Sequence, residues 1–184
     1  MKGADQVTSI FPLDGIRRKL RAQGGENANA AVAILFRRVE GELELLLVKR
    51  AEVPGDPWSG DMAFPGGKQI PQDRDIMHTV VREVREETNI DLEANLFLGK
   101  MEIVFSTVRP DYSVLPLVFL QETEADIKIN EELTSYLWAP FNKLEGSRDR
   151  TMIKNLTVPV FRVLGEVVWG LTYRIIGNLF ELAR

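Results

Sequence analysis

The sequence predicts an α/β (α+β) sandwich, in which helices pack on a mixed β-sheet. Two patterns support this prediction: short apolar runs with the length of buried strands recur along the chain, and a few segments show a helical period. The 184 residues correspond to one domain of ordinary size and can bury a substantial core. We therefore expect a single domain over residues 1–184, with residues 1–28 as an N-terminal extension.

The first elements are a short helix and a strand hairpin. Residues 12–22 predict the helix, and a glycine- and asparagine-containing break follows at 24–27. The continuous apolar run 30–36 has the length of a buried strand. Gly41 then marks a turn, and residues 42–48 alternate between glutamate and leucine, which predicts the hairpin partner of that strand.

The next segment combines a long loop with the clearest helix of the chain. Residues 54–67 contain three prolines and four glycines, so we expect a structured loop without regular elements, anchored by Trp58 and Phe64. Long ordered loops are often functional. Residues 73–89 predict a helix, because apolar side chains recur there at helical spacing. These apolar residues are Ile76, Met77, Val80, Val81 and Val84.

The second half of the chain continues the mixed pattern. We expect strands at residues 97–108, 113–120, 135–138 and 158–163, and a short helix at 140–144. After Val168, apolar residues recur with a helical period up to Leu182, which predicts a final helix. We interpret Trp169 and the apolar stripe of that helix as core or as the surface of a homodimer.

Composition excludes several kinds of site. The chain contains no cysteine and one histidine, His78. Disulfides, thiolate nucleophiles, zinc–thiolate sites and iron–sulfur clusters are thereby excluded. A site built from several histidines and a Ser-His-Asp triad are also disfavoured, and we interpret His78 as structural or exposed.

Charge and hydropathy give no sign of a nucleic-acid or membrane partner and favour an internal compartment. The net charge of −4 gives no sign of a nucleic-acid or membrane partner. No uncharged apolar run approaches the ~18 residues that would suggest a membrane span, and the N-terminus lacks the apolar region of a secretory signal. We therefore expect a cytoplasmic protein.

A cluster of carboxylates ends the helix predicted at residues 73–89. The three glutamates Glu83, Glu86 and Glu87 are three and four residues apart, which places them on one helix face. This arrangement is locally unfavourable, because like charges repel and anions near a helix C-terminus oppose the helix dipole. Clustered carboxylates suit a hard divalent cation such as Mg²⁺ or Mn²⁺. A solvated, salt-bridged helix face is the alternative interpretation.

Two features flank this helix. Before it stands Phe64-Pro65-Gly66-Gly67, and a glycine pair lets backbone groups approach a ligand or metal closely. After it stands Asn89, a residue that tolerates the left-handed conformation with which many helices end.

Glycine pair, helix and ordered carboxylates together resemble the Nudix box, over residues of about 66–90. That motif is Gly, five residues, Glu, seven residues, then Arg-Glu-aliphatic-x-Glu-Glu-x-Gly-aliphatic. Its core is matched by Arg82, Glu83, Val84, Glu86, Glu87 and Ile90. Asn89 replaces the usual glycine, and Asp73 stands where glutamate is expected, with eight residues rather than seven between it and Arg82. We assign Asp73 no catalytic role.

Within the Nudix hydrolase family, the chain resembles the coenzyme A pyrophosphatase branch. The resemblance rests on the lengthened box, on Arg50-Ala51 followed by Gly60 and Phe64-Pro65-Gly66-Gly67, and on Trp169-Gly170-Leu171-Thr172. The branch usually has a further arginine between Arg50 and Gly60, where this chain has Gly55 and Asp56.

The resemblance implies a Nudix-type α/β/α sandwich and a pyrophosphohydrolase that depends on Mg²⁺ or Mn²⁺. Its most direct substrate would be coenzyme A or acyl-coenzyme A, cleaved to 4′-phosphopantetheine and adenosine 3′,5′-bisphosphate. The alternatives are ADP-ribose, a dinucleotide or another nucleotide derivative as substrate, and a non-catalytic nucleotide-binding module.

The resemblance also implies roles for individual residues. Glu83 and Glu87 would be metal ligands, with Glu86 as a third or bridging ligand and the Gly66 carbonyl completing the shell. Arg82 would orient a carboxylate. Candidates for the general base are Glu83 and Glu86, or Glu131 and Glu132 in the later loop.

Candidate substrate-binding residues flank the proposed metal site. Arg50 and Arg109 each end a predicted strand and could meet a phosphate, and Trp58 could stack on a base or anchor its loop. We also expect Gly67 to contact the substrate.

Overall fold

The computed structural model describes residues 11–24 and 27–184, so residues 1–10 and 25–26 of the expected extension lie outside it. The helices are α1 (Phe11–Lys19), α2 (Ile76–Thr88), α3 (Phe141–Leu144) and α4 (Gly170–Ala183), with 3-10 turns at Leu92–Ala94 and Glu145–Ser147. The strands of the main sheet are β1 (Ala30–Val39), β2 (Glu42–Arg50), β3 (Met62–Ala63), β4 (Gly66–Lys68), β5 (Leu96–Lys100), β6 (Val104–Phe105), β7 (Ser113–Leu120) and β8 (Leu133–Pro140). A smaller sheet contains β9 (Arg148–Ile153), β10 (Leu156–Val163) and β11 (Glu166–Val168).

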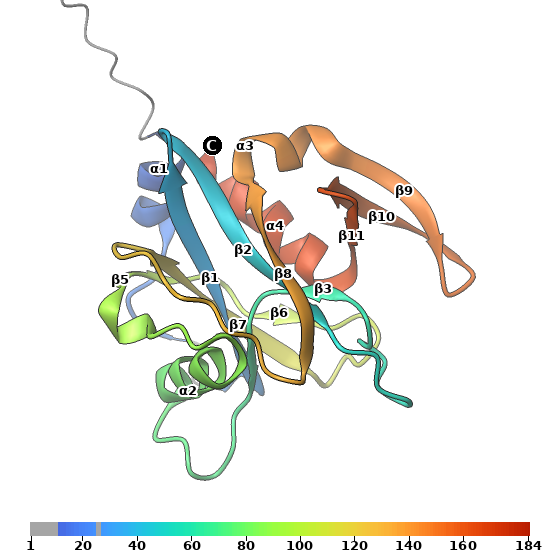
Figure 1. The fold of residues 1–184 in the computed structure, drawn as a ribbon, viewed down its shortest axis with the longest axis horizontal. Coiled ribbons are helices and arrows are strands. Elements are labelled where there is room, and N and C mark those ends of the chain that lie inside the picture. The colour runs from blue at the N-terminus through green and yellow to red at the C-terminus, as the bar shows by residue number, and fades with distance from the viewer. Residues whose placement is uncertain (1–10, 25–26) are drawn as a thin grey trace, which may run out of the picture.

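The main sheet is mixed, as predicted. Its path runs β3-β2-β1-β7-β5, with β4 paired to β1, β6 to β7 and β8 to β2. The β1–β7 pair is parallel and the other pairs are antiparallel. β1 pairs with β2 near its end and with β4 near its start, so the chain that follows β2 returns to the first residues of β1 (Figure 1).

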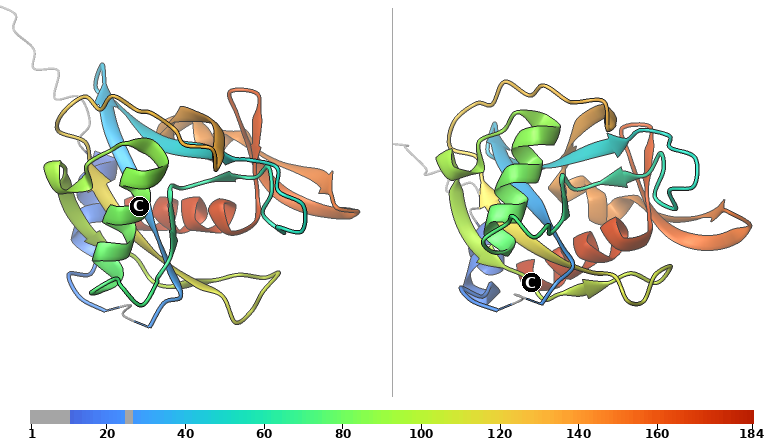
Figure 2. Two further views of the ribbon diagram at one scale, coloured as in Figure 1. Left: turned by 60° about the horizontal axis from the view of Figure 1, so that its bottom comes forward. Right: turned by 90° about the horizontal axis from the view of Figure 1, so that it is seen from below.

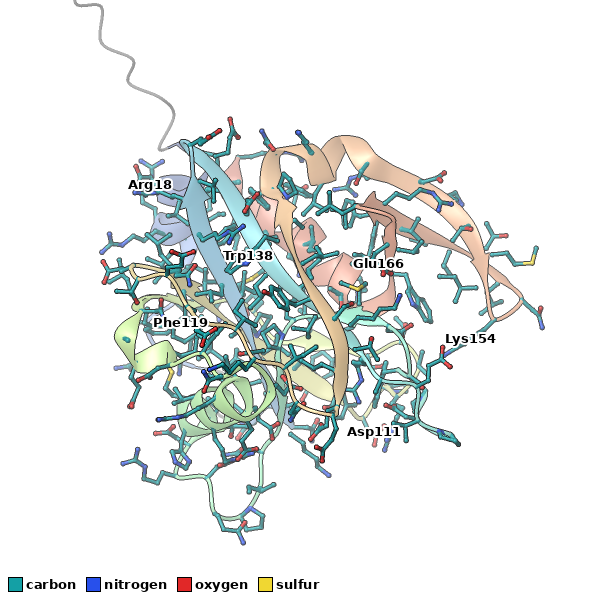
Figure 3. The ribbon with its side chains drawn as sticks, in the orientation of Figure 1. Arg18, Asp111, Phe119, Trp138, Lys154 and Glu166 are labelled. Carbon is teal, nitrogen blue, oxygen red and sulfur yellow. The ribbon has the colours of Figure 1, made fainter. Side chains whose placement is uncertain are left out.

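Helices cover both faces of this sheet, which makes the architecture an α/β/α sandwich. Successive residues of a strand point to opposite faces, and in β1 both sets are buried. Ala33 and Leu35 pack in the cluster that contains the apolar stripe of α2, whereas Ile34 and Phe36 pack in the cluster that contains α1 and α4. Figure 2 shows green α2 and red α4 on opposite sides of the sheet, and Figure 3 labels Phe119 and Trp138 in the α2 layer.

The structure confirms the elements with strong local signals. The β1–β2 hairpin turns at Gly41, which has φ +86° and needs the freedom of glycine. α2 begins after Asp75, whose carboxylate accepts the His78 amide as an N-cap. It ends at Asn89 with φ 62° and ψ 11°, the left-handed cap expected from the sequence.

Three predictions about elements were wrong in part. Residues 54–67 contain β3 and the start of β4, because both short strands are held by pairing to β2 and β1 rather than by local propensity. The strand expected at 97–108 is interrupted, because residues 101–103 separate β5 from β6 and β6 ends at Phe105. β9 and β11 were not predicted as strands; both form by antiparallel pairing with β10.

Within residues 11–24 and 27–184, no helix combines the length and the apolar character needed to cross a membrane.

Candidate active site

The candidate site lies where the last turns of α2 meet the glycine pair of β4. The helix buries Val80 and Val84 beneath the sheet. Glu83 follows Val80 by three residues, and Glu87 follows Val84 by three residues. Both glutamates therefore lie at the edge of this buried helix face, where the core meets the candidate site. Glu87 is only 3% exposed, which is unusual for a glutamate.

Glu87 is anchored to the glycine pair. Its Oε2 accepts the Gly66 amide at 2.8 Å. Burial raises the pKa of Glu87 to about 8, and the negative charges of Glu83 and Glu132 add to this effect, while the Gly66 hydrogen bond partly opposes it. A buried carboxylate with these neighbours favours a partner that brings positive charge.

Glu83 lies against the second glycine. A Cβ atom on Gly67 would overlap the Glu83 carboxylate. Because glycine has no side chain, the carboxylate can occupy this space. Burial raises the pKa of Glu83 above its usual value, although hydrogen bonding to Arg82 opposes the rise. Gly66 is equally constrained, because it has φ +142° and a Cβ there would overlap the backbone of β1.

Arg82 forms hydrogen bonds with two of the glutamates. Its Nη1 donates to Glu83 at 2.9 Å and to Glu86 at 3.2 Å. Its Nε and Nη2 donate to the two carboxylate oxygens of buried Asp73, both at 2.9 Å. This paired geometry lowers the pKa of Asp73 well below its usual value and raises the pKa of Arg82. Asp73 therefore orients Arg82. The Nδ1 atom of His78 lies 3.1 Å from Oδ1 of Asp73.

A cleft of about 360 Å³ opens in front of the two glutamates. Arg50 at the end of β2 and Glu132 before β8 line it beside them. Three aromatic side chains also line it, namely Trp58, Tyr112 and Trp169. The Trp58 and Tyr112 rings lie 5.1 Å apart.

The structure brings most, but not all, of the expected site residues to this cleft. It is lined by Glu83, Glu87, Gly66, Gly67, Glu132, Arg50 and Trp58. Glu86 is exposed over 58% of its side chain, and Glu86, Arg82, Glu131 and Arg109 are not among the lining residues. Arg109 instead places its guanidinium 5.9 Å from the Trp58 ring centre.

Sequence reasoning missed several lining residues. Trp169, expected in the core or at a dimer surface, lines the cleft and donates its Nε1–H to Asp61 at 2.8 Å. Trp169 lies there because it is the residue between β11 and α4. Hydrophobic periodicity predicts a strand or a helix, but it does not predict how the chain turns between them. Tyr112, Asp56 and Asp61 also line the cleft. For Asp56 and Asp61, the available sequence signal was the proline- and glycine-rich composition of the loop that contains them, which indicated a functional loop.

The residues present fit a divalent cation. Glu83 is close enough to raise the pKa of Glu87, and oxygen donors of this kind suit Mg²⁺ and Mn²⁺. In the described part of the chain, no three His, Cys, Asp or Glu side chains already converge as a metal-ligand group. Arg82 bonds one oxygen of each carboxylate, Oε1 of Glu83 and Oε2 of Glu86, so it can orient both groups while their second oxygens meet a cation.

Fold and cleft together define the class of protein: an α/β/α sandwich with a carboxylate site beside a mixed sheet. The chain belongs to the Nudix family, since the model of the NUDIX domain matches residues 27–157. It is a pyrophosphohydrolase acting on a small nucleotide derivative, and enzymes of this family generally need divalent metal ions.

Curated relatives cover most of the chain. The chain is 30% identical over 171 residues to the human "Mitochondrial coenzyme A diphosphatase NUDT8", a match that covers 87% of this chain and 70% of that protein. It is 27% identical to the mouse protein of the same name, over 79% of this chain and 73% of the relative. An "Uncharacterized Nudix hydrolase NudL" from Yersinia enterocolitica is 27% identical, over 84% of this chain and 82% of that protein.

Solved structures with low sequence identity share the fold. A MutT/nudix family protein from Enterococcus faecalis has a TM-score of 0.55 at 17% identity, covering 98% of this chain and 74% of that chain. An Ap4A hydrolase from C. elegans has a TM-score of 0.53 at 23% identity, covering 61% of this chain and 80% of that chain.

Proposed function

We propose that this pyrophosphohydrolase cleaves coenzyme A or acyl-coenzyme A to 4′-phosphopantetheine and adenosine 3′,5′-bisphosphate, using Mg²⁺ or Mn²⁺. The observation that carries the substrate is the relation to a coenzyme A diphosphatase at 30% identity over 87% of the chain. The cleft supports it, because charged and aromatic side chains lie side by side, as a nucleotide substrate requires.

Glu83 and Glu87, with Glu86 and the Gly66 carbonyl, would hold the cation. When bound, it supplies positive charge for the phosphate oxygens and activates water. Arg82 holds Glu83 in place through a 2.9 Å hydrogen bond. Gly67 leaves room for the Glu83 carboxylate because it has no side chain.

Glu132 is our preferred general base among the later carboxylates. It lines the cleft, and its charge raises the pKa of both Glu83 and Glu87. Glu131 does not line the cleft. A base must come within hydrogen-bond reach of the attacking water, and Glu132 is the member of the pair on the correct side. Glu83 and Glu86 stay as alternatives.

Arg50 and Trp58 would bind the substrate. Arg50 lines the cleft and carries a charge that acts on Glu87, so it can contact a phosphate next to the metal site. Trp58 is half-buried and pairs with Tyr112, and this aromatic pair offers a stacking surface for a base. Arg109 would contribute through Trp58 rather than by direct contact.

A second set of substrates is ADP-ribose, dinucleotides and other nucleotide derivatives. The observation in its favour is Asp56, a carboxylate that binds Arg50 at 2.8 Å within the cleft. It occupies a region where a further arginine would strengthen the binding of a phosphate-rich substrate.

We also propose that residues 1–184 form one Nudix hydrolase domain, with the box at about 66–90 and residues 1–28 as its extension. Leu13 and Ile16 of this extension are buried in the cluster that also contains α4, so the described part of the segment is tied to the rest of the fold.

The test is mass spectrometry of the products formed from coenzyme A, protein and Mg²⁺ in ¹⁸O-labelled water. We expect 4′-phosphopantetheine, with the label marking the attacked phosphorus, and loss of turnover when a chelator removes the metal. ADP-ribose and NADH run in parallel. Turnover of one of these without coenzyme A cleavage would overturn the proposed substrate and retain the family reaction.

A further inference from the structure

The loop between β2 and β3 is built around one carboxylate. Asp56 accepts the backbone amide of Trp58 on Oδ1 at 3.0 Å and the Arg50 guanidinium on Oδ2 at 2.8 Å. Its backbone joins two further turns, since its amide bonds the Val53 carbonyl and its carbonyl accepts the Ser59 amide. Asp56 thus links the fold of the loop to the end of β2.

The pair with Arg50 is stronger than a surface contact. The side chains are exposed by 34% for Arg50 and 18% for Asp56. Burial alone would raise the pKa of Asp56, but hydrogen bonds from Arg50 and the Trp58 amide hold it below its usual value. Asp56 is therefore charged at neutral pH, and the guanidinium meets a full negative charge.

Arg50 itself keeps unused hydrogen-bonding capacity. Among the described residues, its Nε is buried without a hydrogen-bond partner, and its Nη2 is the atom that Asp56 holds. The same guanidinium acts on the charge of Glu87, so it faces both the loop and the carboxylates. A buried donor without an acceptor costs free energy, and because this Nε is enclosed, a phosphate in the cleft would meet the Nη edge of the guanidinium.

Orientation matters for such a side chain. A free arginine loses about 2 kcal/mol of rotamer entropy when it is fixed, and this loss weakens binding if it occurs when the substrate arrives. Here Asp56 fixes the side chain before any substrate enters. The outer side of the loop is also held, because Lys154 of the β9–β10 hairpin donates to the Pro57 carbonyl at 2.6 Å (Figure 3).

We propose that Asp56 is a positioning residue for substrate binding: it holds the Arg50 guanidinium in the orientation that receives a phosphate of the substrate. This inference rests on the proposed function, in which Arg50 binds a phosphate. Asp56 itself does not touch the reacting atoms, and its effect reaches the substrate through Arg50.

The experiment is a double-mutant cycle. Asp56→Asn keeps an oxygen for the Trp58 amide and removes the charge that Arg50 meets, and Arg50→Gln removes the group that Asp56 is proposed to orient. KM and kcat are measured for coenzyme A in all four forms, or for ADP-ribose if the wild type cleaves only that. We expect Asp56→Asn to raise KM about fivefold with kcat within about twofold, and to have almost no effect on KM in the Arg50→Gln background.

Asp149→Asn is the matched control. Asp149 also accepts an arginine, Arg162 at 2.6 Å, and a backbone amide, that of Arg150 at 2.7 Å, but it lies on the small sheet. We expect it to leave KM unchanged in both backgrounds. Asp56→Glu, which restores the charge, is expected to give a KM between those of the wild type and Asp56→Asn.

An equal rise in KM in both backgrounds would overturn the proposal, since it would show a role in the loop that is independent of Arg50. An unchanged KM in Asp56→Asn would overturn it as well. If the wild type cleaves neither substrate, the proposed function fails on its own. The same cycle is then measured as the dissociation constant of inorganic pyrophosphate with Mg²⁺, with the same expected pattern.

Discussion

At the scale of the residue, Glu87 illustrates a conflict between stability and activity. A glutamate that is 3% exposed, with its pKa raised to about 8, is a poor choice for stability alone. Within residues 11–24 and 27–184, its carboxylate accepts one hydrogen bond, from the Gly66 amide, and this bond does not require a charge. The carboxylate is explained better by the ligand that it is proposed to bind.

Glu87→Gln tests this interpretation. Glutamine retains an oxygen for the Gly66 amide but cannot supply a negative charge to a cation. We expect kcat to fall at least about a hundredfold, while the free energy of unfolding, measured by urea titration without metal, stays equal or rises. Glu93→Gln, at an exposed position, is the control and should change neither. A strongly destabilised Glu87→Gln protein would contradict the argument.

Asp73 shows the opposite case, a buried carboxylate that serves stability. It accepts two hydrogen bonds from Arg82 and one each from the Thr79 hydroxyl and the Ile70 amide. Asp73→Asn leaves the guanidinium without a matching anion, so we expect a loss of about 2–3 kcal/mol in the free energy of unfolding at pH 7.

The pH dependence has a definite sign. The pKa of Asp73 is lower in the folded protein than its ordinary value of 3.8, so its stabilisation is fully present above that value and is lost as the pH falls below it. The difference in stability between wild type and Asp73→Asn should therefore narrow between about pH 4 and pH 2. Urea titrations at pH 7, 5, 4 and 3 measure it, and a constant difference would contradict the assignment.

At the scale of the element, the contact of α2 with β4 depends on two adjacent glycines with different constraints. Gly66 has a positive φ and lies against the backbone of β1, whereas the three atoms nearest to a Cβ on Gly67 belong to the end of the Glu83 side chain. The β1 backbone cannot move away from a new Cβ atom on Gly66 without disturbing the sheet. The Glu83 side chain, in contrast, can rotate away from a Cβ atom on Gly67. The same substitution at the two positions should thus have separable effects.

We expect Gly66→Ala to lower the free energy of unfolding by at least about 2 kcal/mol, from overlap and backbone strain. Gly67→Ala should lower it by less than about 1 kcal/mol yet reduce kcat about tenfold or more, because the Glu83 carboxylate must move. Urea unfolding and steady-state kinetics of the two variants measure both quantities. Similar stability losses in both would contradict this distinction.

Elements also show what the sequence could and could not predict. The apolar stripe of α2 and its cap at Asn89 depend on residues close in sequence, so local patterns predicted both; the N-cap at Asp75, which starts the helix at Ile76 rather than at residue 73, was not predicted. β9 was not predicted, since its alternating charges give no apolar face and it exists through pairing with β10. The Arg50–Asp56 pair and the position of Trp169 likewise depend on how loops and junctions fold, which no periodicity reports.

At the scale of the whole molecule, a chain of aromatic rings joins the two sheets. Phe161 of β10 contacts Phe180 of α4 at 5.9 Å between ring centres, Phe180 stacks on Phe141 at 4.8 Å, and Phe141 meets Phe36 of β1 at 5.4 Å. The small sheet projects from the body of the molecule (Figure 1), yet its base shares the core of the main sheet. The two sheets should therefore unfold together.

Phe180→Ala tests this coupling, because it removes the ring between the sheets. We expect a loss of about 3–5 kcal/mol in the free energy of unfolding, whereas Phe105→Ala, at a ring that is 56% exposed, should cost less than about 1 kcal/mol. Hydrogen exchange should give the amides of Val160 and Ile34 the same opening free energy in the wild type and the same decrease in Phe180→Ala. If only Val160 lost protection, the small sheet would be an independent unit, and its contact with the cleft through Lys154 and Trp169 would not be fixed by the main core.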